Sequence, residues 1–170
     1  MGVFYEFDEV DAFTVGTVGK PGQRIFLLQA RVGRQRVTVK CEKQQAAAIS
    51  QYLRKVLIDL PSPSDRPIAD AMELTDPGDP VFTLGPIGLG YDRDQDRLLV
   101  QLEEVVDVDE SGEPVDDDAS ERGHIRVFLS RSQALAFCDH SESVIAAGRP
   151  TCMWCTDPMN PDGHACRRMN

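Results

Sequence analysis

Apolar residues in the first sixty positions follow two periods, and the change of period separates predicted strands from a predicted helix. Apolar and polar side chains alternate along four stretches: Val3–Phe7, Val10–Val18, Arg24–Val32 and Gln35–Cys41. Such alternation predicts β-strands, and we expect the first two to form a hairpin around a tight turn at Asp8 and Glu9. From residue 46 to residue 57 the apolar residues recur at helical spacing, until Pro61 stops the pattern.

The same order of elements returns after residue 80. The run FTVGTVG that starts at Phe13 has the same spacing of Phe, Thr and Gly as the run FTLGPIG that starts at Phe82. We therefore interpret the chain as two related halves, about 1–60 and 81–147, joined by a linker at 61–80. The strands predicted in the second half cover 81–90, 97–106 and 124–129, and its helix covers 131–147.

These elements predict an α+β fold in which each half ends in one helix. One half alone is too small to bury a stable core. We expect the halves to share one largely antiparallel sheet with both helices on one face, which leaves the opposite face partly open.

Aligning the halves places Gln101 over Gln29 and Glu103 over Arg31. The open face would then present a candidate ligand or partner surface made of Gln29, Arg31, Arg36, Lys40, Gln101 and Glu103. The alternative is that these side chains only pair with one another in solvent.

Charge is distributed unevenly along the chain. The net charge of −10 argues against general nucleic-acid binding, because duplex affinity comes largely from neutralising phosphates. From Lys20 to Lys55 there are nine basic residues and one acidic residue, whereas Asp65 to Arg122 holds eighteen acidic residues and four basic ones. Part of that acidity lies in an insertion at 107–123 that has no counterpart in the first half.

Composition places the protein among folded cytoplasmic proteins. The hydrophobic fraction is 41%, and no apolar run reaches the roughly 18 residues that a membrane span requires. The N-terminal residues show no basic segment and no apolar stretch of signal-peptide length. The odd number of five cysteines fits a reducing compartment better than a disulfide framework. We therefore expect a cytoplasmic location and no membrane partner.

The C-terminal tail, residues 149–170, carries the clearest chemical signal and follows a main domain that we place at 1–148. Cys152 and Cys155 are separated by two residues, and His164 and Cys166 follow closely. Three thiolates and one imidazole form a closed tetrahedral set, which is how structural zinc is held. We predict a zinc knuckle here. Iron in a similar set and a redox-active CxxC are the alternatives. The arginines that flank the knuckle are Arg149, Arg167 and Arg168.

Signatures at both ends of the chain resemble an uncharacterised family of actinobacterial proteins, a domain of unknown function. The resemblance implies a cytoplasmic protein with a zinc-ribbon-like tail and implies no activity. This chain has Met153, Thr156 and Arg167 where the usual tail has Pro, Gly and Pro. The resemblance rests on Tyr5-Glu-Phe-Asp8, Phe13, Gly16-Thr-Val-Gly19, Pro21-Gly22, Arg24, Phe26-Leu27, Gln29-Ala-Arg31, Glu42-Lys-Gln-Gln45, Gly148-Arg-Pro150, Cys152, Cys155, Asp162-Gly-His164 and Cys166.

Three functional hypotheses follow from the sequence. The first is a non-catalytic module that binds another protein, because the metal set is closed, no nucleophile with its base is recognisable and the charge is segregated. The second is an enzyme or small-ligand binder that holds an anion over Gln29, Arg31, Arg36 and Lys40. The third is nucleic-acid contact through the knuckle and its arginines.

Overall fold

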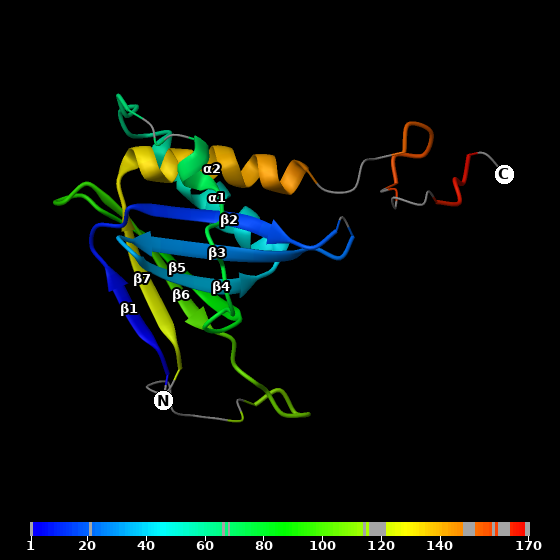
Figure 1. Cartoon of the computed structure of the whole chain (residues 1–170), viewed down its shortest axis with the longest axis horizontal. Helices are drawn as coiled ribbons and strands as arrows, with labels where there is room; N and C mark the ends of the chain where they lie inside the picture. Colours follow the sequence, from blue (N-terminus) through cyan, green and yellow to red (C-terminus); the bar gives the residue numbers. More distant parts are fainter. Residues whose placement is uncertain are drawn as a thin grey trace.

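The computed structural model describes residues 2–20, 22–65, 67, 69–113, 115, 122–147, 152–157, 159 and 164–168. The fold is α+β, with two strand-rich halves that each end in one helix (Figure 1). The first half contains β1 (Phe4–Phe7), β2 (Ala12–Val18), β3 (Ile25–Val32), β4 (Gln35–Cys41) and α1 (Lys43–Leu57). A short 3₁₀ helix, η1 (Ala69–Met72), lies between the halves. The second half contains β5 (Leu84–Asp92), β6 (Arg97–Glu104), β7 (His124–Leu129) and α2 (Arg131–Ala146).

One hydrophobic core joins both halves, as the small size of each half requires. Alternate residues of β3 and β4 and of β6 and β7 point into it, including Leu28, Val39, Val100 and Val127. Both helices close the same side of the strands, and α1 packs against α2 (Figure 1). The ring of Phe13 on β2 stacks on Phe137 of α2 at a centroid distance of 5.0 Å.

The strands form two sheets, which corrects the expectation of one shared sheet. The orders are β2-β3-β4 and β1-β7-β6-β5. Residues 81–83 connect the two, since Val81 N–H donates to Thr38 O at 2.8 Å and Val105 N–H donates to Thr83 O at 2.8 Å. The pairing register of β5 shifts between Leu84 and Ile87, where Pro86 has no N–H to donate. The first sheet therefore continues into the second only through this short segment.

The first strand pairs differently from our expectation. Instead of forming a hairpin with β2, β1 lies parallel to β7, with Phe4 opposite His124 and Phe7 opposite Val127. The Phe4 ring meets the His124 ring edge-on at 4.4 Å, and Phe7 is buried in the core. The N-terminal strand thus completes the sheet of the second half, because β7 offers a free edge and an apolar face that β1 can extend.

The two helices begin in the same way, and the first turn of each helix forms a hydrogen bond with the other half of the chain. Each starts with a capping box, in which the third helical residue, Gln45 or Gln133, accepts a hydrogen bond from the N-cap N–H. The same Gln45 side chain donates to Gly85 O of the second half at 3.0 Å. The Gln133 side chain donates to Val10 O of the first half at 2.6 Å. The two halves share an order of elements, and their origin as a repeat stays a prediction.

Within the described residues, no helix is long and apolar enough to cross a membrane.

Candidate metal centre

The basic face predicted on the first sheet is covered by the chain itself. Gln29 is fully buried beneath residues 71–76, where its side chain donates to Thr75 O at 3.0 Å and accepts from Thr75 N–H at 3.0 Å. Arg31 donates to Ala71 O and to the Thr75 hydroxyl, and Arg36 pairs with Asp76 at 2.9 Å. The expectation of an open face is therefore wrong for the first half. Sequence reasoning missed this because a linker rich in proline gives no pattern that predicts where it packs.

Of the remaining residues predicted for that face, Lys40 lies on β4 of the first sheet, whereas Gln101 and Glu103 lie apart from it. Gln101 and Glu103 are on β6, on the outer face of the other sheet, where the Gln101 side chain donates to a Glu103 carboxylate oxygen at 2.9 Å. Arg31 contacts the covering segment rather than Glu103. Lys40 is exposed, and its main-chain N–H donates to Phe82 O. The structure thus divides the candidate surface between two sheets.

The four predicted metal ligands come together. Cys152, Cys155, His164 and Cys166 each offer one ligand atom, and these atoms all lie within 4.8 Å of one another. The Cys155 Sγ is 3.1 Å from the His164 Nε2, and the Cys152 Sγ is 3.9 Å from the Cys166 Sγ. Cys152 and Cys166 are buried and the other two are half-buried. This donor set is the one that thiophilic cations prefer, so the cluster could hold a metal ion.

Main-chain hydrogen bonds shape the loop that presents the first two sulfurs. Thr156 N–H donates to Cys152 O at 2.9 Å, and Cys152 N–H donates to Asp157 O at 2.8 Å. The Trp154 N–H donates to the Cys152 Sγ at 3.4 Å. The loop closes with Thr156 at a φ of 63°, in the left-handed region that glycine usually occupies. Thr156 thus adopts a backbone conformation that is usual for glycine.

The thiols of the cluster differ in their tendency to ionise. Hydrogen bonds from the main-chain N–H groups of Cys155 and Trp154 lower the pKa of Cys152. A main-chain hydrogen bond from Asp157 acts in the same direction on Cys155, but burial and the neighbouring sulfurs leave the pKa of Cys155 raised. Crowded thiolates repel one another, so a cation is needed to ionise the whole set.

An ion pair ties the two ends of the cluster together. Arg167, directly after Cys166, contacts the Asp157 carboxylate through Nη2 at 2.6 Å and Nε at 3.1 Å. This pairing lowers the pKa of Asp157. Arg168 is exposed, and Arg149 lies outside the described residues. Sequence reasoning named the arginines but missed Asp157, whose carboxylate gives Arg167 a partner inside the tail.

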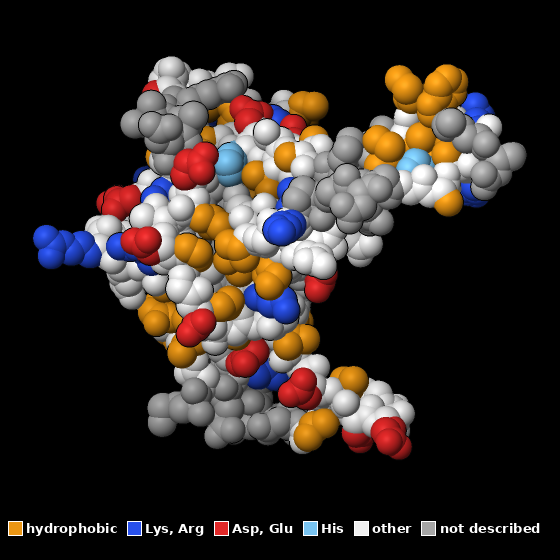
Figure 2. Space-filling view, turned by 45° about the vertical axis from the view of Figure 1, so that its right-hand side comes forward, with side chains coloured by type: hydrophobic (Ala, Val, Ile, Leu, Met, Phe, Trp, Pro, Cys, Tyr) orange, Lys and Arg blue, Asp and Glu red, His pale blue; other side chains and the backbone are white. Residues whose placement is uncertain are grey.

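One side of the tail is apolar. Met153 and Trp154, between the first two cysteines, are 83% and 56% exposed. Figure 1 shows the tail apart from the sheets, and Figure 2 shows hydrophobic side chains gathered on the upper side of the tail in that view.

The other two cysteines are structural. Cys41 and Cys138 are buried in the core, and burial raises their pKa to about 12 and about 11. Both remain neutral thiols at physiological pH and behave as small apolar residues.

These features define a class: an α+β protein of two interlinked strand-and-helix halves, followed by a compact cluster of three cysteines and one histidine. The chain belongs to the family described as protein of unknown function (DUF3090), whose model matches residues 5–166. Searches of the curated proteins and of the solved structures found no match. The family description carries neither an activity nor an organism, so the actinobacterial origin stays a prediction.

Proposed function

We propose that Cys152, Cys155, His164 and Cys166 hold one structural zinc ion, and that the protein is a cytoplasmic, non-catalytic module that binds another protein. The observation that carries the proposal is the convergence of these four ligand atoms within 4.8 Å. Four protein ligands complete a tetrahedral shell and leave no position for a catalytic water. Zinc fits this mixture of thiolate and imidazole ligands, and a reducing compartment keeps the thiols free.

Two exposed apolar side chains of the tail support the protein-binding role. Met153 and Trp154 are large apolar side chains held in solvent next to the metal cluster. Tryptophan and methionine are enriched in protein interfaces, and tryptophan is frequent among residues that dominate binding energy. A metal-fixed loop would present both side chains in one conformation, which lowers the entropy cost of binding.

The metal proposal is tested by elemental analysis of protein purified without added metal. We expect one zinc per chain in the wild type and loss of zinc in Cys152→Ser. Cys138→Ala is the matched control, because Cys138 is a cysteine outside the cluster, and it should retain zinc. Iron instead of zinc would overturn the identity of the metal. Absence of any metal, with reactive thiols at Cys152 and Cys155, would favour the redox alternative.

The protein-binding proposal is tested by affinity purification from cells that produce the protein at native level. Proteins retained by the wild type should be lost with the double variant Met153→Ser and Trp154→Ser, whose zinc content should stay unchanged. Ile58→Ser removes an equally exposed apolar residue elsewhere, at 82% exposure, and serves as the control. If the double variant captures the same proteins as the wild type, the proposal is contradicted.

The two other hypotheses gain no specific support. An anion over Gln29 and Arg31 would have to displace residues 71–76. At the tail, Arg167 already pairs with Asp157, and the net charge of −10 repels phosphates.

A further inference from the structure

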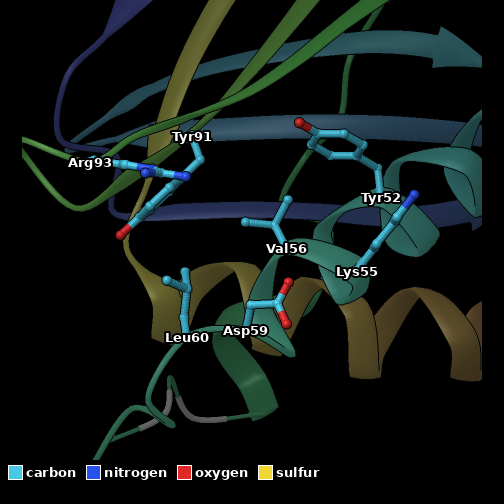
Figure 3. Close-up of a pocket in the computed structure, with 7 residues that line it drawn as sticks. All are labelled: Tyr52, Lys55, Val56, Asp59, Leu60, Tyr91 and Arg93. Atoms are coloured by element: carbon cyan, nitrogen blue, oxygen red, sulfur yellow. The ribbon is translucent and has the colours of Figure 1, made fainter.

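A hollow of about 820 Å³ lies between the C-terminal part of α1 and the hairpin that joins β5 to β6 (Figure 3). Its volume is within the range of small-molecule sites, roughly 300–1,000 Å³. Its lining is Tyr52, Lys55, Val56, Asp59 and Leu60 from the first half, and Tyr91 and Arg93 from the second. The hollow is far in the sequence from the metal ligands and shares no residue with them.

The lining combines an apolar floor with aromatic walls. Figure 3 shows Val56 between the two tyrosines, with Tyr52 on α1, Tyr91 on the strand opposite and Leu60 below Tyr91. Two aromatic rings facing an aliphatic floor favour a flat, aromatic ligand, because such a ligand buries apolar area against each wall.

Three charged groups of the hollow are available to a ligand. Among the residues that the structure describes, Lys55, Asp59 and Arg93 have no ion-pair partner, in contrast to Arg54, which contacts two carboxylates. Two cations and one anion make the hollow locally positive on a molecule of net charge −10. The cations suit a carboxylate, phosphate or sulfonate group, and Asp59 suits an N–H or O–H donor of the same ligand.

The wall formed by Tyr91 is held in place before any ligand arrives. The Tyr91 hydroxyl donates to Asp96 at 2.6 Å, which raises the pKa of Tyr91. Arg131, the first residue of α2, donates to the other Asp96 oxygen at 3.0 Å and also to Pro61 O. This chain of contacts fixes the hairpin to the segment that follows α1. A preformed site loses little entropy on binding, which favours affinity.

We propose that this hollow is a binding site for a small aromatic anion that also carries a hydrogen-bond donor. The aromatic body lies over Val56 between Tyr52 and Tyr91, the anionic group faces either Lys55 or Arg93, which lie at opposite ends of the hollow in Figure 3, and the donor faces Asp59. The site goes beyond the proposed function and does not depend on the metal cluster. It also differs from the anion site expected on the first sheet, whose place is taken by residues 71–76.

The probe is 8-anilinonaphthalene-1-sulfonate, which has an aromatic body, a sulfonate and an N–H donor. Fluorescence titration of the full chain should give saturable binding of one probe per chain. The double variant Lys55→Ala and Arg93→Ala should bind about tenfold more weakly, since it removes the cations at both ends of the hollow and leaves none to face the sulfonate. The control Arg34→Ala and Lys43→Ala removes two exposed cations elsewhere and should bind as the wild type does.

We expect Asp59→Asn to change the affinity for the probe in the opposite direction. Removing a negative charge near the sulfonate, while keeping an acceptor oxygen for the N–H, should strengthen binding severalfold. Amide NMR shifts on titration should be confined to residues 52–60 and 89–97. Equal binding by all variants, shifts centred on the tail, or no saturable binding would each overturn the proposal. Zinc content is measured in every variant, so a failure here is distinguishable from a failure of the metal proposal.

Discussion

Thr156 is the residue at which this chain departs most informatively from the tail that it resembles. Its φ of 63° lies in the left-handed region, where a β-branched side chain crowds the following carbonyl group. The strain is of the order of 1–2 kcal/mol for an L-residue. Its hydroxyl donates to Cys155 O at 2.6 Å, which offsets part of that cost. The loop therefore holds the two cysteines in register in spite of an unfavourable residue.

Thr156→Gly should tighten metal binding. Glycine removes the strain of the folded loop but also makes the metal-free loop more flexible, so we expect an affinity about threefold higher rather than tenfold. Zinc affinity is measured by competition with a chromophoric chelator. Thr156→Asn should fall between the two, because asparagine tolerates positive φ. Weaker binding by the glycine variant would mean that the threonine hydrogen bond outweighs the strain.

Gln29 shows how one buried amide can fix a segment that has no regular structure of its own. The side chain forms two hydrogen bonds with the main chain of Thr75 and a third with Thr38. Its amide thus supplies the donor and the acceptor that a neighbouring strand would otherwise offer to Thr75. A buried main-chain group that loses its partner costs about 1–3 kcal/mol.

Gln29→Ala should lower the free energy of unfolding by about 2–3 kcal/mol, since it leaves a cavity and unpaired main-chain groups. Gln101→Ala is the matched control, because Gln101 occupies the outer face of the other sheet, where its side chain donates to Glu103 and holds no covering segment in place. We expect the control to change stability by less than about 0.5 kcal/mol. Chemical denaturation measures both. Similar losses in the two variants would show that residues 71–76 are not held by Gln29.

At the scale of elements, α1 and α2 pack together, with the Cys138 thiol donating to Ser50 O at 3.4 Å, and a charged clamp formed by Arg54 links them at the surface. Arg54 of α1 contacts both carboxylate oxygens of Glu142 at 2.8 and 2.9 Å and reaches Asp139 at 2.5 Å, both on α2. The hydrogen bonds from Arg54 lower the pKa of Glu142. Because the clamp is about one-third to one-half exposed, water screens it and its contribution is about 1 kcal/mol or less.

The clamp makes a pH-dependent contribution to stability. The folded-state pKa of Glu142 is below its unfolded value of about 4.3, so its contribution is fully present above that range and is lost as the pH falls through the lowered folded pKa. Glu142→Gln should therefore destabilise the protein by up to about 1 kcal/mol at pH 7 and by much less near pH 3. Denaturation at both pH values checks this, with Glu9→Gln as control. A gap that stays constant with pH would contradict the assignment.

The whole molecule consists of a core that joins the two halves and a tail whose described residues lie outside that core. The buried hydrophobic cluster extends from Phe7 to Cys138 and includes none of the tail residues that the structure describes. The buried side chains of the tail, Cys152 and Cys166, contact each other within the metal cluster. In a segment with so few apolar residues, a metal bound by these ligands would supply much of the local stability.

Metal removal should therefore unfold the tail and leave the main body intact. Trp154 is the single tryptophan of the chain, so its fluorescence reports on the tail alone. We expect a chelator to shift the Trp154 emission to the red, while the thermal midpoint followed by far-ultraviolet circular dichroism stays within about 2 °C. A large fall in that midpoint would show that the tail stabilises the body. Re-addition of zinc should restore the emission.

The sequence by itself determined the elements and the metal ligands. The predicted strand 35–41 is the observed β4, and the helical pattern ending at residue 57 is the observed α1. Alternation and helical spacing are local properties of neighbouring residues, so they can be read without the rest of the chain. The same holds for Cys152 and Cys155, whose separation is set by one short loop.

Only the tertiary structure decided which elements lie together. Every strand edge offers the same main-chain donors and acceptors, so alternation predicts that β1 is a strand but not that β7 is its partner. The linker covers the first sheet through Gln29 and Arg31, contacts between residues more than forty positions apart. The hollow between α1 and the hairpin combines side chains of both halves. Local periodicity contains no information about such long-range packing, which depends on how the complete core closes.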